Sequence, residues 1–145
     1  MLSLFLVAFV SATLLPGGSE VWLARLWCLG EPAILLWAVA TTGNTLGSLV
    51  NVAMGRYARQ FQDRRWFPAS PKRLAQAERW YHKLGEASLL LSWLPVVGDP
   101  LTVLAGLFRL PWWRAFLWIL VAKGARYAVV LVLAHQWLLP LCQIK

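Results

Sequence analysis

The feature that most constrains this chain is an uncharged apolar run of 24 residues at 32–55. As a helix with a rise of 1.5 Å per residue it would be about 36 Å long, enough to cross the ~30 Å hydrocarbon core of a bilayer. Residues 112–139 are also long enough, although Lys123 and Arg126 lie near their middle. Hydrophobic residues make up 59% of the 145-residue chain and charged residues 14%. A soluble domain of this size could not bury so much apolar surface. We therefore expect an all-α integral membrane protein and exclude a soluble globular domain and a disordered chain.

Two further apolar blocks are interrupted by helix-breaking residues. Their halves are residues 2–15 and 21–29 in the first block, and 87–94 and 101–108 in the second. As helix each half is roughly 12–21 Å long, too short to cross the bilayer. Two interpretations remain for each block: one kinked crossing helix, or a re-entrant hairpin that enters the membrane and returns on the same side. The breaking residues are Pro16, Gly17 and Gly18 in the first block, and Pro95, Gly98 and Pro100 in the second.

The two halves of the chain repeat one plan. An acidic residue follows a proline by four positions in each broken block, Glu20 in the first and Asp99 in the second. Each block then leads into a crossing helix that carries a polar, small-residue segment. The chain thus reads as one membrane domain with two copies of hairpin plus helix, joined by a connector. The segments are repeat 1 at 1–56, the connector at 57–85 and repeat 2 at 86–145.

Basic residues are concentrated in the connector. The net charge is +8, and eight of the 14 Lys and Arg residues fall between Arg56 and Lys83. A basic loop between apolar blocks is typical of the cytoplasmic side. With two re-entrant hairpins the repeats are then inverted and both termini lie outside, whereas a kinked crossing helix would move the N-terminus to the cytoplasm. Residues 72–84 have the spacing of an amphipathic interfacial helix, with a solvated linker as the alternative. The favoured partners are anionic lipid head groups rather than nucleic acid.

Four charges in or beside the apolar blocks need partners, because an ion near the bilayer centre is costly. Glu20 and Asp99 lie where the second half-helices begin, so they either cap those helices or form a protonatable, head-group-contacting site. Lys123 and Arg126 are three positions apart and share a helix face. They could pair with the two acids as a purely structural contact, or bind a phosphate.

Polar side chains within the first crossing helix have two interpretations as well. Asn44 and Asn51 are seven positions apart and therefore share a face. They either line the same polar path as the charges or hydrogen-bond to a neighbouring helix. Cys28 and Cys142 have no ligand-type spacing and are expected to be small apolar residues. We expect no metal and no cofactor.

Four stretches together span nearly the whole chain: Ser11–Glu20, Gly43–Gly47 with Gly55–Arg56, Leu91–Asp99 with Ala105–Gly106, and Lys123–Tyr127. They resemble the DedA family of bacterial membrane proteins (the VTT, or SNARE-associated-like, domain), most closely its short YqaA-like branch. The resemblance implies two re-entrant hairpins and a role in moving lipids across the bilayer, with undecaprenyl phosphate and phospholipids as substrates and coupling to protons. It also implies that Glu20 matches the acid of the first hairpin.

The second hairpin departs from the family pattern. Most members carry arginines at the positions that hold Ser92 and Gly98 here. If those arginines bind lipid phosphate, this chain must use Arg126 or Lys123 instead.

The leading hypothesis is therefore a multi-pass transporter of the bacterial inner membrane that translocates or scrambles lipid. One alternative is a small-solute, proton-coupled exporter that acts as a homodimer, and another is a non-transporting membrane scaffold. We do not expect an enzyme, because no catalytic motif stands out. A homo-oligomer is expected, since two hairpins and two crossing helices are few elements to enclose a wet cavity.

Overall fold

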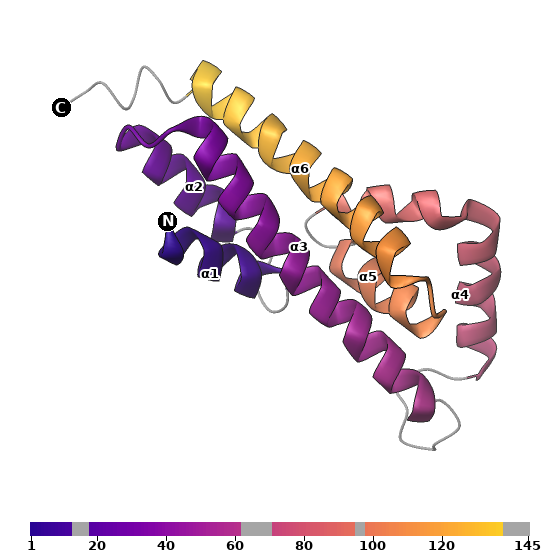
Figure 1. Cartoon of the computed structure of the whole chain (residues 1–145). Coiled ribbons are helices and arrows are strands. Elements are labelled where there is room, and N and C mark those ends of the chain that lie inside the picture. Colours follow the sequence, from indigo (N-terminus) through magenta and orange to yellow (C-terminus); the bar gives the residue numbers. More distant parts are fainter. Residues whose placement is uncertain (13–17, 62–70, 95–97, 138–145) are drawn as a thin grey trace.

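The computed structural model describes residues 1–12, 18–61, 71–94 and 98–137, and every regular element in these segments is helical (Figure 1). This confirms the all-helical prediction. The elements are α1 Leu2–Ser11, α2 Gly18–Cys28, α3 Ala33–Ala58, the 3₁₀ segment η1 Arg59–Phe61, α4 Pro71–Leu84, the 3₁₀ segment η2 Glu86–Trp93, α5 Gly98–Leu107 and α6 Trp112–Trp137.

The two long helices coincide with the two long apolar runs. α3 and α6 have 26 residues each, about 39 Å at 1.5 Å per residue, and both are apolar enough to cross a membrane. Only 28% of the most apolar window of α6 is buried within the chain. Large side chains such as Val121 and Val132 are instead exposed, by 56% and 57%. A core helix of a soluble protein would bury these side chains, so the exposure agrees with a lipid-facing helix.

The first broken block folds back on itself instead of continuing as one kinked helix. α1 and α2 lie side by side (Figure 1), and the indole of Trp22 in α2 donates to the hydroxyl of Ser3 in α1 over 3.3 Å. Leu4 and Ala8 of α1 share a buried cluster with Leu23 of α2. η2 and α5 of the second block likewise contact each other. Each broken block is therefore a pair of short helices in contact, and we call these pairs the hairpins.

The second helix of each hairpin begins earlier than the sequence suggests. Gly18 and Gly98 are the first residues of α2 and α5, and Pro100 lies in the first turn of α5, so these three residues are not breaks. The first N–H groups of a helix have no intrahelical acceptor, and a proline there loses no hydrogen bond. The other predicted breaks, Pro16, Gly17 and Pro95, lie outside the described residues.

Glycines allow α3 to pack backbone to backbone with both hairpins. A Cβ at Gly43 would lie 2.6 Å from the carbonyl oxygen of Phe5 in α1, and one at Gly47 would lie 2.8 Å from the Cβ of Ala12. Farther along α3, a Cβ at Gly55 would collide with the backbone of α5. Small residues permit such close approach between membrane helices. The middle of α3 thus holds α1, and its C-terminal part holds α5 (Figure 1).

Side chains of α3 also hydrogen-bond to carbonyl groups at the end of α1. The amide of Asn44 donates to the carbonyl of Ala8 over 2.9 Å, and that of Asn51 donates to the carbonyl of Ala12 over 2.8 Å. Carbonyls at the end of a helix carry partial negative charge, and that of Ala8 also accepts the backbone N–H of Ala12. The interhelical hydrogen bonds anticipated as one role for these two asparagines are therefore present.

Arginines perform the same task at the end of α5. Arg59 donates to the carbonyl of Leu107 over 2.7 Å, and Arg56 donates to the carbonyl of Leu110. Arg59 sits where the dipole of α5 is negative, whereas Leu110 lies just beyond α5. The end of α5 and the residues that follow it are therefore held by side chains from α3 and η1.

The connector contains the predicted helix as α4. Trp80 and Leu84 are exposed by 58% and 55%, while Tyr81 packs on Phe108 with ring centroids 5.1 Å apart. Burial, with a smaller effect of Glu86, raises the pKa of Tyr81 to about 12. The tyrosine is thus a neutral anchor that fixes α4 to the second hairpin.

Candidate functional site

Two ion pairs join the hairpins to one face of α6. Arg126 pairs with Glu20, which lies in the first turn of α2. Lys123 Nζ lies 3.2 Å from Oδ1 of Asp99, in the first turn of α5. The two cations are three positions apart and so project from adjacent turns. The anticipated pairing of these four charges is therefore observed, and each hairpin contributes one acid.

The cations are more enclosed than the acids. The side chain of Lys123 is 1% exposed and that of Arg126 is 12% exposed, against 24% for Asp99 and 21% for Glu20. Oε2 of Glu20 is buried and has no hydrogen-bond partner among the described residues. Removing two ions from water is costly and their attraction must compensate for it. The site is thus an arrangement of buried positive charge in which a second anion could take the place of a carboxylate.

Tyr127 belongs to the site and was not among the predicted site residues. It is fully buried, and its hydroxyl donates to Oγ of Ser19 over 2.8 Å. Ser19 precedes Glu20 and Tyr127 follows Arg126, so this hydrogen bond runs beside the first ion pair. A buried phenol needs a polar partner, so a tyrosine inside an apolar run could have been predicted to have one. The sequence does not reveal that Ser19 is that partner.

A polar row on α3 completes the interior. Thr41, Asn44, Thr45 and Ser48 follow the i, i+3, i+4, i+7 spacing of one helix face and are all buried. The three hydroxyls and Oδ1 of Asn44 have no hydrogen-bond partner among the described residues. In contrast, the exposed Thr42 donates to the carbonyl of Ala38. Buried polar groups are normally satisfied by protein or ordered water, so this face is suited to a hydrated interior.

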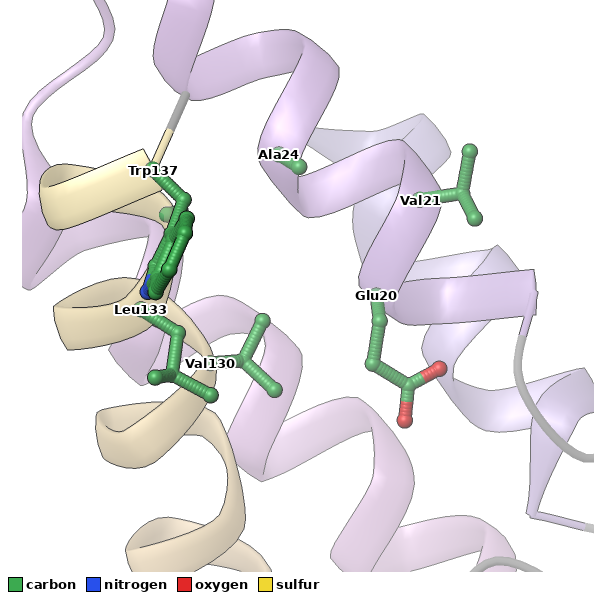
Figure 2. A pocket seen from close by; sticks show the side chains of 7 residues that line it. Glu20, Val21, Ala24, Val130, Leu133 and Trp137 are labelled. Carbon is green, nitrogen blue, oxygen red and sulfur yellow. The ribbon is translucent and has the colours of Figure 1, made fainter. Parts of the chain in front are cut away.

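An apolar groove opens beside the first ion pair, between α2 and α6 (Figure 2). Its volume is about 430 Å³. Glu20 reaches toward it from α2, and Val130, Leu133 and Trp137 flank it on α6 (Figure 2). Val21 and Trp137 are exposed by 73% and 74%, so the groove is open to the surroundings. One charged group therefore adjoins an otherwise apolar, externally accessible surface.

Cys28 departs from expectation. It is disulfide-bonded and is not the free small apolar residue that the sequence suggested, while Cys142 lies outside the described residues. In the segments that the structure describes, no cluster of three or more His, Cys, Asp or Glu side chains is arranged to hold a metal ion.

A sequence model of the VTT domain matches residues 3–136, nearly the whole chain. The chain belongs to the VTT-domain family. The match confirms the resemblance to DedA proteins that the sequence motifs carried.

Proteins of known sequence agree with this assignment. The chain is 41% identical over 132 residues to proteins named inner membrane protein YqaA in Escherichia coli K12 and Shigella flexneri, covering 90% of this chain and 87% of each relative. It is 37% identical over 146 residues to a protein of Haemophilus influenzae named only as uncharacterized, covering 94% of this chain and 88% of that one. No solved structure matches the chain.

Proposed function

We propose that this chain is a transporter of the bacterial inner membrane that moves a lipid with an anionic head group, undecaprenyl phosphate or a phospholipid, across the bilayer. The observation that carries the proposal is the pair of enclosed ion pairs on α6, Glu20–Arg126 and Asp99–Lys123, of which the first adjoins an apolar groove through Glu20. The inner-membrane name of the relatives supports the location.

Helix lengths support re-entrant hairpins in an inverted repeat. α1 and α2 have 10 and 11 residues, about 15–17 Å as helix, which is half of a ~30 Å hydrocarbon core. Each hairpin would therefore reach the midplane and return. Lys123 is about 17 Å along α6 from Trp112, which is also near the middle of the helix. Broken helices that meet at the midplane recur in secondary transporters.

The charge distribution supports one orientation of these hairpins. The positive-inside rule predicts that the basic connector faces the cytoplasm. With re-entrant hairpins, the open end of the first hairpin, where α2 ends at Cys28, would then face the periplasm.

The mechanism exchanges one anion for another. A phosphate entering the site accepts hydrogen bonds from the guanidinium of Arg126 and the ammonium of Lys123, in place of the carboxylates of Glu20 and Asp99. The buried cations are never left without a counter-charge, which would be costly. Protonation of a carboxylate frees its cation for the phosphate and links lipid movement to protons. The apolar groove accommodates the hydrocarbon chain while the head group passes.

The test is translocation of labelled phospholipid and labelled undecaprenyl phosphate in proteoliposomes. We expect transport by the wild type and at least a tenfold loss in Glu20→Gln and in Arg126→Gln, because each substitution removes one half of an enclosed ion pair. A tenfold rate change corresponds to about 1.4 kcal/mol, well within the cost of disrupting such a pair. Arg25→Gln is the matched control, since Arg25 is exposed on α2 and stacks on Trp22 away from the site.

Three outcomes would contradict the proposal. If the wild type moves neither lipid faster than empty liposomes, these substrates are wrong. If proton-driven export of small solutes is measured instead, the exporter is the correct function. If Glu20→Gln and Arg126→Gln only lower the abundance of the protein in cells, the ion pairs belong to a membrane scaffold.

A further inference from the structure

A second groove follows the opposite hairpin, and the proposed transport step does not use it. It consists of two adjoining hollows of about 510 and 280 Å³, both lined by Val121 of α6. η2 forms the other wall through Glu86, Leu90 and Trp93. We call it the η2–α6 groove. None of its lining residues lines the groove at Glu20.

The η2–α6 groove is elongated along the axis of α6. On α6 it extends from Arg114 to Val129, about 22 Å at 1.5 Å per residue. One leaflet of the hydrocarbon core is ~15 Å thick. Between these two residues the lining of α6 is apolar, which matches a hydrocarbon chain lying along the helix.

The mouth of the groove carries one charge of each sign. Nη1 of Arg114 lies 2.7 Å from Oε1 of Glu86, and the two side chains are 46% and 31% exposed. The guanidinium also stacks on Trp113, 5.0 Å from the ring centroid. An exposed ion pair of this kind contributes little to the stability of the fold. Both groups can therefore re-pair with a ligand at little cost.

The geometry points to a phospholipid with a zwitterionic, primary-ammonium head group as the occupant of the η2–α6 groove. The phosphate binds the guanidinium of Arg114, the ammonium binds the carboxylate of Glu86, and an acyl chain lies along α6 past Val121. A phosphoglycerol head group supplies only negative charge, which Glu86 repels. A trimethylammonium head group lacks the N–H donors that a carboxylate accepts. The inference rests on the membrane placement of the proposed function, but not on transport.

Native mass spectrometry of the detergent-purified full chain tests this site with three probes: phosphatidylethanolamine, phosphatidylglycerol and phosphatidylcholine of identical acyl chains. We expect phosphatidylethanolamine to bind about fivefold more tightly than either of the others, the effect of one charged contact at a membrane surface. Glu86→Gln should abolish the preference over phosphatidylglycerol. Arg114→Gln should weaken all three lipids, and Arg25→Gln, which removes another Trp-stacked arginine, should weaken none.

A second variant tests the groove without altering the ion pair. Ala125 is exposed and lines the smaller of the two hollows. Ala125→Trp should therefore fill this hollow and reduce phosphatidylethanolamine binding. Ala128→Trp is the matched control, because Ala128 is exposed on α6 but lines neither hollow. Helix content by circular dichroism and a single gel-filtration peak establish that each variant is folded.

The two proposals fail separately. Equal binding of the three lipids by the wild type, or an unchanged preference in Glu86→Gln, overturns the η2–α6 site whatever the transport assay gives. Absence of translocation together with the expected binding preference contradicts the proposed function alone and leaves this site standing.

Discussion

Among single residues, Lys123 depends most directly on one partner. Its side chain is almost fully enclosed, and its ammonium faces the carboxylate of Asp99. Removing the lysine ammonium from water costs free energy, and its attraction to the paired carboxylate offsets this cost. The spacing between Lys123 and Arg126 is visible in the sequence, but the identity of each acid's partner is not.

We expect Asp99→Asn to lower the free energy of unfolding by about 3–5 kcal/mol, because it leaves a buried cation uncompensated. The double variant Asp99→Asn with Lys123→Met should recover most of this loss, since it removes the unpaired charge while keeping an apolar stem. Thermal unfolding in detergent measures both. A double variant that is no more stable than the single one would show that Lys123 has another counter-charge.

Among contacts between whole helices, the packing of α1 on α3 depends on Gly43 and Gly47 of α3. We call this contact the glycine seam. It brings the backbones together and allows Asn44 to reach the carbonyl of Ala8. A helix of 10 residues is marginal by itself, so α1 depends on this contact.

Gly47→Val should destabilise the protein by about 1–3 kcal/mol, the usual cost of overpacking, because the added side chain meets Ala12 and the backbone of Phe9. Thr42→Val is the control, since Thr42 is exposed on the same helix and valine keeps its shape. The midpoint of thermal unfolding in detergent compares them. Equal midpoints for Gly47→Val and Thr42→Val would mean that α1 does not need close packing on α3.

For the whole molecule, the property that matters most is the orientation of the hairpins in the bilayer. The side-by-side packing of α1 and α2 sets the position of one helix relative to the other. The side of the membrane on which the hairpin opens depends on how the chain is inserted. The basic connector predicts that this opening faces the periplasm, on the membrane side opposite to the connector itself.

A single cysteine at residue 2, with both native cysteines replaced by serine, should react with a membrane-impermeant maleimide on intact cells. A cysteine at Gln76, which is exposed on α4, should react only after the cells are permeabilised. Labelling of residue 2 only after permeabilisation would contradict a re-entrant first hairpin, because it would put the N-terminus in the cytoplasm.

Much of the fold is local in origin and was therefore readable from the sequence. The lengths of the apolar runs predicted α3 and α6 to within three residues at each end, and the amphipathic spacing predicted α4. The starts of α2 and α5 were misplaced by three residues, because Gly18, Gly98 and Pro100 disfavour a helix interior but are compatible with a first turn. Helix propensity is a property of a single residue type. Whether a glycine or proline falls in the first turn of a helix or in its interior depends on the residues around it.

The sequence by itself determined that the chain must satisfy its backbone within helices and that four charges near the apolar blocks require partners, because both follow from the cost of leaving polar groups in hydrocarbon. Only the tertiary structure decided the pairing. Glu20 with Arg126 and Asp99 with Lys123 are 106 and 24 positions apart, and Tyr127 reaches Ser19 across 108. Helical spacing relates residues a few positions apart, so contacts between hairpins and α6 depend on how the glycine seams of α3 orient the helices around it.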